Sequence, residues 1–154
     1  MKKCLGISWS ANGDVTGWAL LSDGRLESGA EDTSEATHID DFTMLMALRL
    51  PTDSADVDAV AWVKPGGPAQ HPVLWLMGFV NDINVGTYGI DPSNLAMFAR
   101  GKIPIAPPPG WSGSRVDLRN ALRSILPHAS PEFSFDEQAV LAAWAALWYA
   151  DGAG

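Results

Sequence analysis

The hydrophobic positions near the start of the chain form short runs that are typical of β-strands. Residues 3–9 (KCLGISW) are mostly apolar and predict a central strand, and residues 15–21 (VTGWALL) predict a second strand. Residues 22–25 (SDGR) predict a hairpin turn, because Asp-Gly tolerates the positive φ angles of a tight turn. Residues 26–30 then return as a short third strand, so the chain is expected to begin with three antiparallel strands.

The middle of the chain predicts helices and buried strands that alternate. Apolar residues at 39, 42, 45, 46, 48 and 50 follow helical spacing and predict a helix over 39–50, which Pro51 ends. Residues 57–63 predict a buried strand, and residues 72–85 predict a mostly apolar helix. Residues 86–101 predict a short strand and a short helix that starts after the stretch Asp91-Pro92-Ser93.

Capping signals mark two helices in the C-terminal third. A short strand is expected at 103–106, closed by the stretch PPPG, and a helix at 114–126, where Ser114 and Asp117 form a capping-box pair. The last helix is expected at 134–150, with a second capping box from Ser134 to Glu137. One face of this helix carries apolar side chains that we expect in the core: Leu141, Trp144, Leu147 and Trp148.

This order of elements predicts a mixed α/β domain. Three antiparallel strands come first, and the later strands need helical crossovers, so those strands pair in parallel. The length of 154 residues suggests one domain over residues 1–154, and the hydrophobic content of 47% is that of a globular protein.

Charge narrows the choice of partners. The net charge is -8 and the isoelectric point about 4.6, which argues against strong non-specific binding of double-stranded nucleic acid. Basic residues nevertheless gather in the C-terminal half, at Arg100, Lys102, Arg115, Arg119 and Arg123. They form either a local basic face that contacts phosphates or an ordinary solvated helix face.

Several other functions are disfavoured. Cys4 is the only cysteine, so it is expected to be a small buried hydrophobe without a disulfide, and His38, His71 and His128 lack metal-ligand spacing. The apolar run after Met1 is too short for a signal peptide, and no run is long enough to span a membrane. A cytoplasmic location is therefore expected.

Four stretches carry a family resemblance: LGISWSANGDVTGWA at the start, VAWVKPG at 60–66, PPPGW at 107–111 with the Arg-bearing helix that follows, and DEQAVLAA at 136–143. In this order and spacing they resemble the RuvC-type Holliday junction resolvases and their phage and prophage relatives. That resemblance implies an RNase H-like fold and a homodimer. It also implies a nuclease in which two divalent ions, Mg²⁺ or Mn²⁺, bind carboxylates and clamp a phosphodiester.

Active members of that family hold the metals with an Asp in the first strand, a Glu that ends the fourth strand and one or two Asp in the last helix. By the resemblance, the first position falls on Ser8 and the second on Val63, or on Trp62 if the match is one residue off. In the last helix, one alignment places the acids on Gln138 and Phe135, and the other keeps Asp136 and places the second acid on Ala139.

The remaining acids near these positions are Asp136, Glu137 and Asp14. Each has a structural explanation, because acids in a first helical turn favour the helix dipole and Asp14 lies in a turn. The first hypothesis is therefore a catalytically inactive RuvC-like protein without a metal cofactor. It would bind branched or single-stranded DNA, with Arg115, Arg119, Arg123 and Lys102 as the binding residues, or it would bind a protein.

Two other hypotheses remain open at this stage. A divergent but active nuclease would hold a single metal ion with Asp14, Asp136 and Glu137. A half domain of the sugar-kinase or actin-like type would share the pattern of the first hairpin, but the chain is short for two lobes and lacks an evident phosphate-binding glycine turn.

Overall fold

The computed structural model describes residues 3–10, 14–22, 25–32, 57–64, 86–102, 112–125 and 136–153. Three expected elements lie outside these residues, namely the helices at 39–50 and 72–85 and the strand at 103–106.

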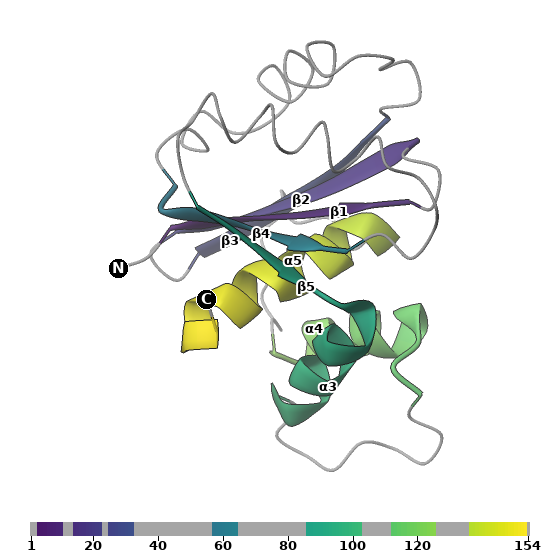
Figure 1. Ribbon diagram of the computed structural model, residues 1–154. Helices are drawn as coiled ribbons and strands as arrows, with labels where there is room; N and C mark the ends of the chain where they lie inside the picture. The colour runs from purple at the N-terminus through teal and green to yellow at the C-terminus, as the bar shows by residue number, and fades with distance from the viewer. Residues whose placement is uncertain are drawn as a thin grey trace.

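A mixed sheet forms the centre of the fold (Figure 1). Its strands are β1 (Cys4–Trp9), β2 (Val15–Ser22), β3 (Arg25–Asp32), β4 (Ala59–Val63) and β5 (Gly86–Ile90), in the order β3-β2-β1-β4-β5. The first three strands pair antiparallel, whereas β4 pairs parallel to β1 and β5 parallel to β4. The predicted antiparallel start and parallel continuation are confirmed.

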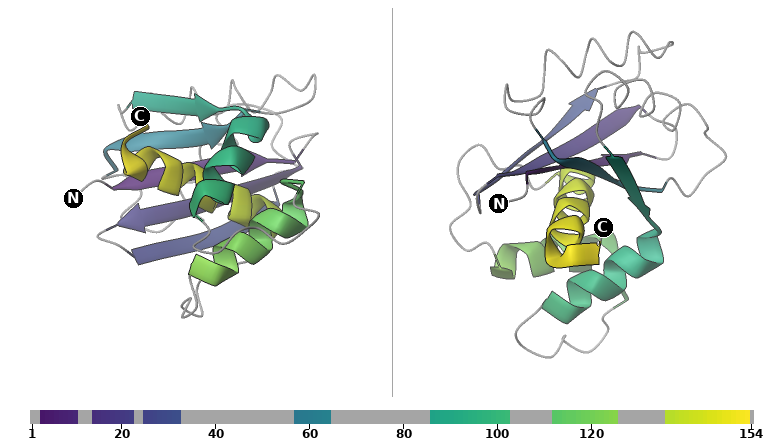
Figure 2. Two further views of the ribbon diagram at one scale, coloured as in Figure 1. Left: turned by 90° about the horizontal axis from the view of Figure 1, so that it is seen from below. Right: turned by 60° about the vertical axis from the view of Figure 1, so that its left-hand side comes forward.

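Three helices lie against one face of this sheet (Figure 2). They are α3 (Pro92–Lys102), α4 (Arg115–Ile125) and α5 (Glu137–Trp148), and α5 continues into a π-helical turn, η2 (Tyr149–Ala153). Helix α5 contacts the sheet directly, and α3 and α4 contact α5 from the other side. Helix α3 begins at Pro92. Proline suits the first helical position, because a backbone N–H there has no partner within the helix and its loss costs no hydrogen bond.

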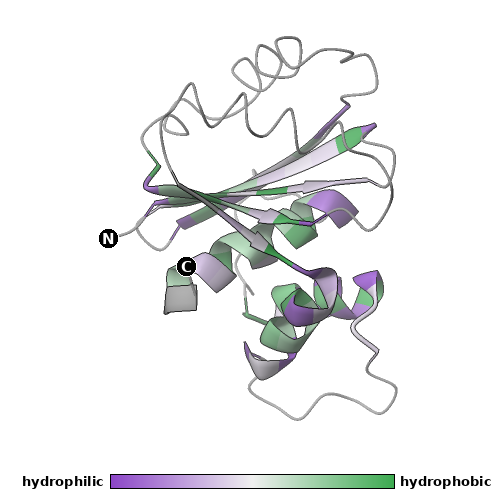
Figure 3. Cartoon of the chain, in the orientation of Figure 1, coloured by the Kyte–Doolittle hydropathy of each residue, from purple (hydrophilic) through white to green (hydrophobic). Residues whose placement is uncertain are grey.

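Beyond its first two residues, helix α5 is apolar, and most of its side chains are buried between the sheet and helices α3 and α4 (Figure 3). Trp144 is fully buried, its Nε1 donates to the carbonyl oxygen of Leu118 at 3.0 Å, and its ring meets Phe98 edge to face at 6.0 Å. Trp148 is partly buried against the same core. The expected core role of both tryptophans is confirmed.

Glycines let α5 approach the sheet closely. A Cβ atom on Gly6 would lie 1.9 Å from the carbonyl oxygen of Ala142, and a Cβ on Gly17 would lie 2.2 Å from the backbone of Gln138. Real Cβ atoms do not approach backbone atoms this closely, so each position requires glycine. The close packing of α5 against β1 and β2 therefore depends on these two glycines.

The opposite face of the sheet carries a row of paired residues. Trp18 and Trp62 both lie beside Ile7, and each faces a glycine on the neighbouring edge strand, Gly29 or Gly89. A Cβ at Gly29 would lie 2.8 Å from the indole of Trp18, and a Cβ at Gly89 would lie 2.9 Å from that of Trp62. The two indoles therefore take the space that side chains on β3 and β5 would otherwise fill.

The start of the last helix differs from the prediction. Asp136 is the N-cap, with an extended backbone (φ -58°, ψ 149°), and its carboxylate accepts a hydrogen bond from the N–H of Gln138. Glu137 is therefore the first helical residue, not the third. The capping box predicted from Ser134 to Glu137 is wrong, because an acid at the first helical position cannot complete it.

Candidate functional site

Ser8 and Gln138 form a buried hydrogen-bonded pair between the sheet and α5. The Ser8 hydroxyl donates to Gln138 Oε1 at 2.8 Å, and the two residues are 1% and 4% exposed. Gly17 pairs with Ser8 across β1 and β2, and its missing side chain leaves room for the backbone of Gln138. Two residues far apart in sequence are thus joined. The resemblance assigns metal-binding acids to Ser8 and, in one of its two alignments of the last helix, to Gln138.

Val63 lies on the same face of the sheet as Ser8. The registered pairs Gly6–Ala61 and Ile7–Trp62 mean that one further step along both strands places Val63 beside Ser8. Val63 is 5% exposed and belongs to the core around α5, whereas Trp62 points to the opposite face and meets the ring of Trp9 there. Of the two residues left open by the sequence, Val63 is the one that accompanies Ser8.

The chemistry of this group does not fit a divalent metal ion. Mg²⁺ and Mn²⁺ prefer charged carboxylate oxygens, but a hydroxyl, an amide and an isopropyl group are neutral. The Ser8 hydroxyl and the side-chain carbonyl oxygen of Gln138 already share a hydrogen bond. Within the described ranges, no group of three or more His, Cys, Asp or Glu side chains could hold a metal ion.

The three remaining acids named from the sequence have other contacts or positions. Asp136 is exposed and caps α5, while Asp14 is exposed at the bend before β2. The carboxylate of Glu137 forms an ion pair with Nη1 of Arg115, the first residue of α4. The pair joins the N-terminal ends of α4 and α5, next to the Ser8–Gln138 bond.

Arg115, Arg119 and Arg123 lie on successive turns of α4. Arg115 and Arg123 are exposed, whereas Arg119 is partly buried, and its Nε has no hydrogen-bond partner in the part of the chain that the structure describes. The row thus starts at the same end of α5 as the Ser8–Gln138 pair.

A capping box fixes the start of α4, as the sequence predicts. The N–H of Asp117 donates to the Ser114 hydroxyl at 3.2 Å, and the N–H of Ser114 donates to the Asp117 carboxylate at 3.3 Å. The N–H and hydroxyl of Ser112 also donate to that carboxylate, at 2.9 and 3.1 Å. Led by the Ser112 N–H, these bonds hold the pKa of Asp117 below its usual value.

Asp117→Asn should therefore destabilise α4 in a pH-dependent way. Because the pKa of Asp117 is lowered on folding, its stabilisation is present above the unfolded pKa near 3.8 and is lost as pH falls through the folded pKa. Thermal melting of wild type and variant should show a difference at pH 7 that shrinks below pH 4. A difference that is unchanged at pH 3 would contradict this role of the carboxylate.

Lys102 lies apart from the arginine row. Its Nζ is 2.7 Å from the carboxylate of Asp151 in η2 and 5.3 Å from the centre of the Phe98 ring. Asp151 is fourteen residues beyond Glu137, so at about 1.5 Å per residue Lys102 and Arg115 contact opposite ends of the last helix, roughly 21 Å apart. The structure does not bring Lys102 together with Arg115, Arg119 and Arg123.

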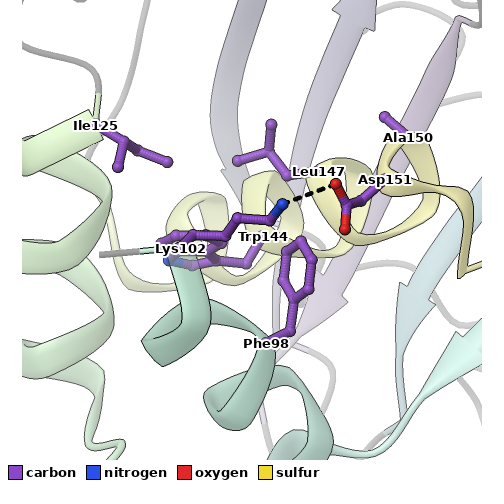
Figure 4. Close-up of a pocket in the computed structure, with 7 residues that line it drawn as sticks. All are labelled: Phe98, Lys102, Ile125, Trp144, Leu147, Ala150 and Asp151. Carbon is purple, nitrogen blue, oxygen red and sulfur yellow. Dashed lines mark hydrogen bonds and ion pairs between the residues drawn. The ribbon is translucent and has the colours of Figure 1, made fainter. Parts of the chain in front are cut away.

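The Lys102–Asp151 pair borders an apolar pocket of about 250 Å³ (Figure 4). The pocket lies between α3, α4 and the end of α5 and is lined by Phe98, Lys102, Ile125, Trp144, Leu147, Ala150 and Asp151. Its polar groups are already paired with each other, and it lies at the end of α5 remote from Ser8 and Gln138. It therefore belongs to a different part of the molecule from the candidate site.

The lone cysteine is buried, as expected. Cys4 is fully enclosed in β1, and burial raises the pKa of its thiol to about 12. The thiolate form is scarce at neutral pH, so Cys4 is not a reactive nucleophile. No helix among the described residues is long and apolar enough to cross a membrane.

Sequence reasoning missed two contacts that shape the site. The Arg115–Glu137 ion pair joins residues from two helices, and no local pattern indicates that they meet. The glycine opposite Ser8 was visible in the sequence as Gly17, but only the seat of α5 explains why it is needed.

Comparison with solved structures identifies proteins of similar fold. The fowlpox virus Holliday junction resolvase matches 99% of this chain and 99% of its own, with a TM-score of 0.52 and 10% sequence identity. YeaZ from Pseudomonas aeruginosa matches 65% of this chain and 48% of its own, with a TM-score of 0.46 and 18% identity. A ROK hexokinase from Thermus thermophilus matches 64% and 38%, with a TM-score of 0.45 and 15% identity.

The chain spans about half the length of YeaZ and less than half of the hexokinase, but the full length of the viral resolvase. No family model matches the chain, and no curated protein matches its sequence. At 10% identity the likeness to the resolvase shows the fold alone. The mixed sheet with its helices is the α/β architecture that the sequence predicts, and it is consistent with the RNase H-like fold that the resemblance implies.

Proposed function

We propose that this chain is a resolvase-like protein that binds branched or single-stranded DNA without cutting it. The observation that carries the proposal is the buried, neutral hydrogen bond between Ser8 and Gln138. The resemblance assigns metal-binding acids to Ser8 and, in one of its two alignments, to Gln138. A two-metal nuclease needs carboxylates there to hold four positive charges close together. The bonded pair supplies none.

The fold is compatible with a role in binding DNA. One solved structure that matches this chain over 99% of its length is the fowlpox virus Holliday junction resolvase. A protein that keeps such a fold while its metal position is neutral can still recognise the shape of a junction, because phosphate contacts need no metal.

Arg115, Arg119 and Arg123 would supply those phosphate contacts. The net charge of -8 works against general attraction to DNA, so binding would depend on this local row and on the geometry of the target. The arms of a four-way junction are related in pairs by two-fold symmetry, and a homodimer would place one arginine row on each half of the junction. We therefore expect a dimer on a four-way junction.

Binding and cleavage should be measured together on a labelled four-way junction and on single-stranded DNA, in Mg²⁺ and in Mn²⁺. We expect a gel shift without cleavage, and the same result for Asp136→Asn. Arg119→Gln and Arg123→Gln should each weaken binding. Each should also make the negative slope of log affinity against log salt concentration shallower by about 1. Sedimentation of the complex would report the dimer.

The outcomes distinguish a DNA-binding protein from a nuclease and from a protein that binds another protein. Cleavage that Asp136→Asn abolishes would overturn the proposal and indicate a divergent nuclease. The absence of both cleavage and binding would also overturn the proposal, and it would direct the search to a protein partner. Binding that the arginine variants do not weaken would place the interface elsewhere.

A further inference from the structure

The ion pair between Arg115 and Glu137 joins two residues with different surroundings. The side chain of Arg115 is 63% exposed, whereas that of Glu137 is 34% exposed. Glu137 is fixed at the first turn of α5, because the next residue, Gln138, is buried and bonded to Ser8. The acid is therefore the stationary partner, and the arginine is the one that faces solvent.

A carboxylate contacts a guanidinium group as a phosphate does. Both offer anionic oxygen atoms to the planar N–H donors of arginine, with similar geometry and charge. A phosphate that approached Arg115 would meet a guanidinium that already has an anionic partner. To bind, it would have to share or replace the carboxylate of Glu137.

The neighbouring arginine supports a phosphate position at this point. Arg119 lies one turn along α4 from Arg115, and its Nε is buried without a hydrogen-bond partner among the described residues. Arg115 and Arg119 thus offer two guanidinium groups within one helical turn.

We propose that Glu137 is a built-in competitor for phosphate: its carboxylate holds Arg115 in the free protein, and a DNA phosphate displaces it. The inference rests on the proposed DNA-binding function and deepens it. Glu137 is then a positioning residue that limits affinity, so that only a DNA with several well-placed phosphates overcomes the competition.

The test is a coupled set of variants in the full chain. We expect Glu137→Gln to bind a labelled four-way junction about threefold more tightly than the wild type, the size expected for release of an exposed ion pair. Arg115→Gln should bind more weakly, and in the Arg115→Gln background the substitution Glu137→Gln should have almost no effect. Glu27→Gln, which makes the same charge change on β3, is the matched control.

Each outcome decides a separate point. A gain in affinity that needs Arg115 and is absent in Glu27→Gln supports the competition. A gain that persists in the Arg115→Gln background, or that equals the gain of Glu27→Gln, would show a general charge effect and overturn it. Junction binding by the wild type with no gain in Glu137→Gln would overturn the inference alone.

If neither the wild type nor Glu137→Gln binds, the proposed function fails as well. Circular dichroism and thermal melting of each variant would show that the fold is retained. A purely structural role of Glu137 at the helix start would change the melting temperature without the dependence on Arg115.

Discussion

Gly6→Ala should lower the free energy of unfolding by about 3 kcal/mol or more, or prevent folding. The added Cβ would lie 1.9 Å from the carbonyl oxygen of Ala142 and 3.1 Å from the backbone nitrogen of Ala146. Both atoms belong to the backbone of α5, which cannot move aside as a flexible side chain could. The whole helix would have to leave its seat on β1.

The measurement is denaturant or thermal unfolding, with Gly101→Ala as the matched control. Gly101 lies in α3, and a Cβ there would meet no atom within 4 Å. Alanine is a better helix former than glycine, so this control should be neutral or more stable by up to about 1 kcal/mol. For a chain of this size, 3 kcal/mol corresponds to a fall in melting temperature on the order of 10 °C.

If Gly6→Ala melts within about 2 °C of the wild type, α5 does not lie against β1 as closely as described. Gly17→Ala gives an independent check, because its added Cβ would lie 2.2 Å from the backbone of Gln138, one helical turn before Ala142. Both substitutions should be severe, since both strands meet the same helix.

The sequence predicted the sheet well because its signals are local. The short apolar runs and the expected turn at 22–25 indicate the antiparallel start, and the expected crossovers between the later strands indicate the parallel pairing of β4 and β5; the strand pairing confirms both orientations. The capping box of Ser114 and Asp117 was also predicted, because both partners lie within one turn.

The start of α5 was misplaced for the same kind of reason. Ser134 and Asp136 are both residues that cap helices, and a local pattern cannot choose between them. The choice of Asp136 coincides with two long-range contacts, of Gln138 with Ser8 and of Glu137 with Arg115.

Lys102 shows the limit of grouping residues by distance along the chain. It is close in sequence to the arginines of α4, but it ends a different helix and pairs with Asp151 beyond α5. The arginine row itself could be predicted because its three members repeat at the spacing of one helix. Where that row meets Glu137 depends on how two helices pack, which no spacing records.

Ser8 and Gln138 offer the most direct test of what this position is. The double variant Ser8→Asp, Gln138→Asp should be less stable than the wild type by about 3 kcal/mol or more at pH 7 without metal. It would set two carboxylates against each other in a buried site where only a neutral hydrogen bond now lies. Like charges at short distance, with burial, raise the pKa of such a pair on folding.

The sign of the pH dependence follows from that rise. A carboxyl group whose pKa is higher in the folded state favours folding below the unfolded pKa and loses that advantage as pH rises through the folded pKa. The double variant should therefore melt closest to the wild type near pH 4 and furthest below it at pH 7. Ser8→Asn, Gln138→Asn has side chains of the same size without charge and should show no such trend.

Divalent metal then decides whether the introduced acids lie where a nuclease of this fold would place them. Mn²⁺ or Mg²⁺ that binds only the folded state should raise the melting temperature of the Asp variant, by an amount that grows with metal concentration, and leave the Asn variant and the wild type unchanged. Adding Val63→Glu should strengthen the effect, because Val63 lies beside Ser8 on the same face. If neither metal raises the melting temperature of the Asp variants, the Ser8–Gln138 pair is an ordinary core contact. A metal-dependent rise in the wild type would instead contradict the neutral site on which the proposed function rests.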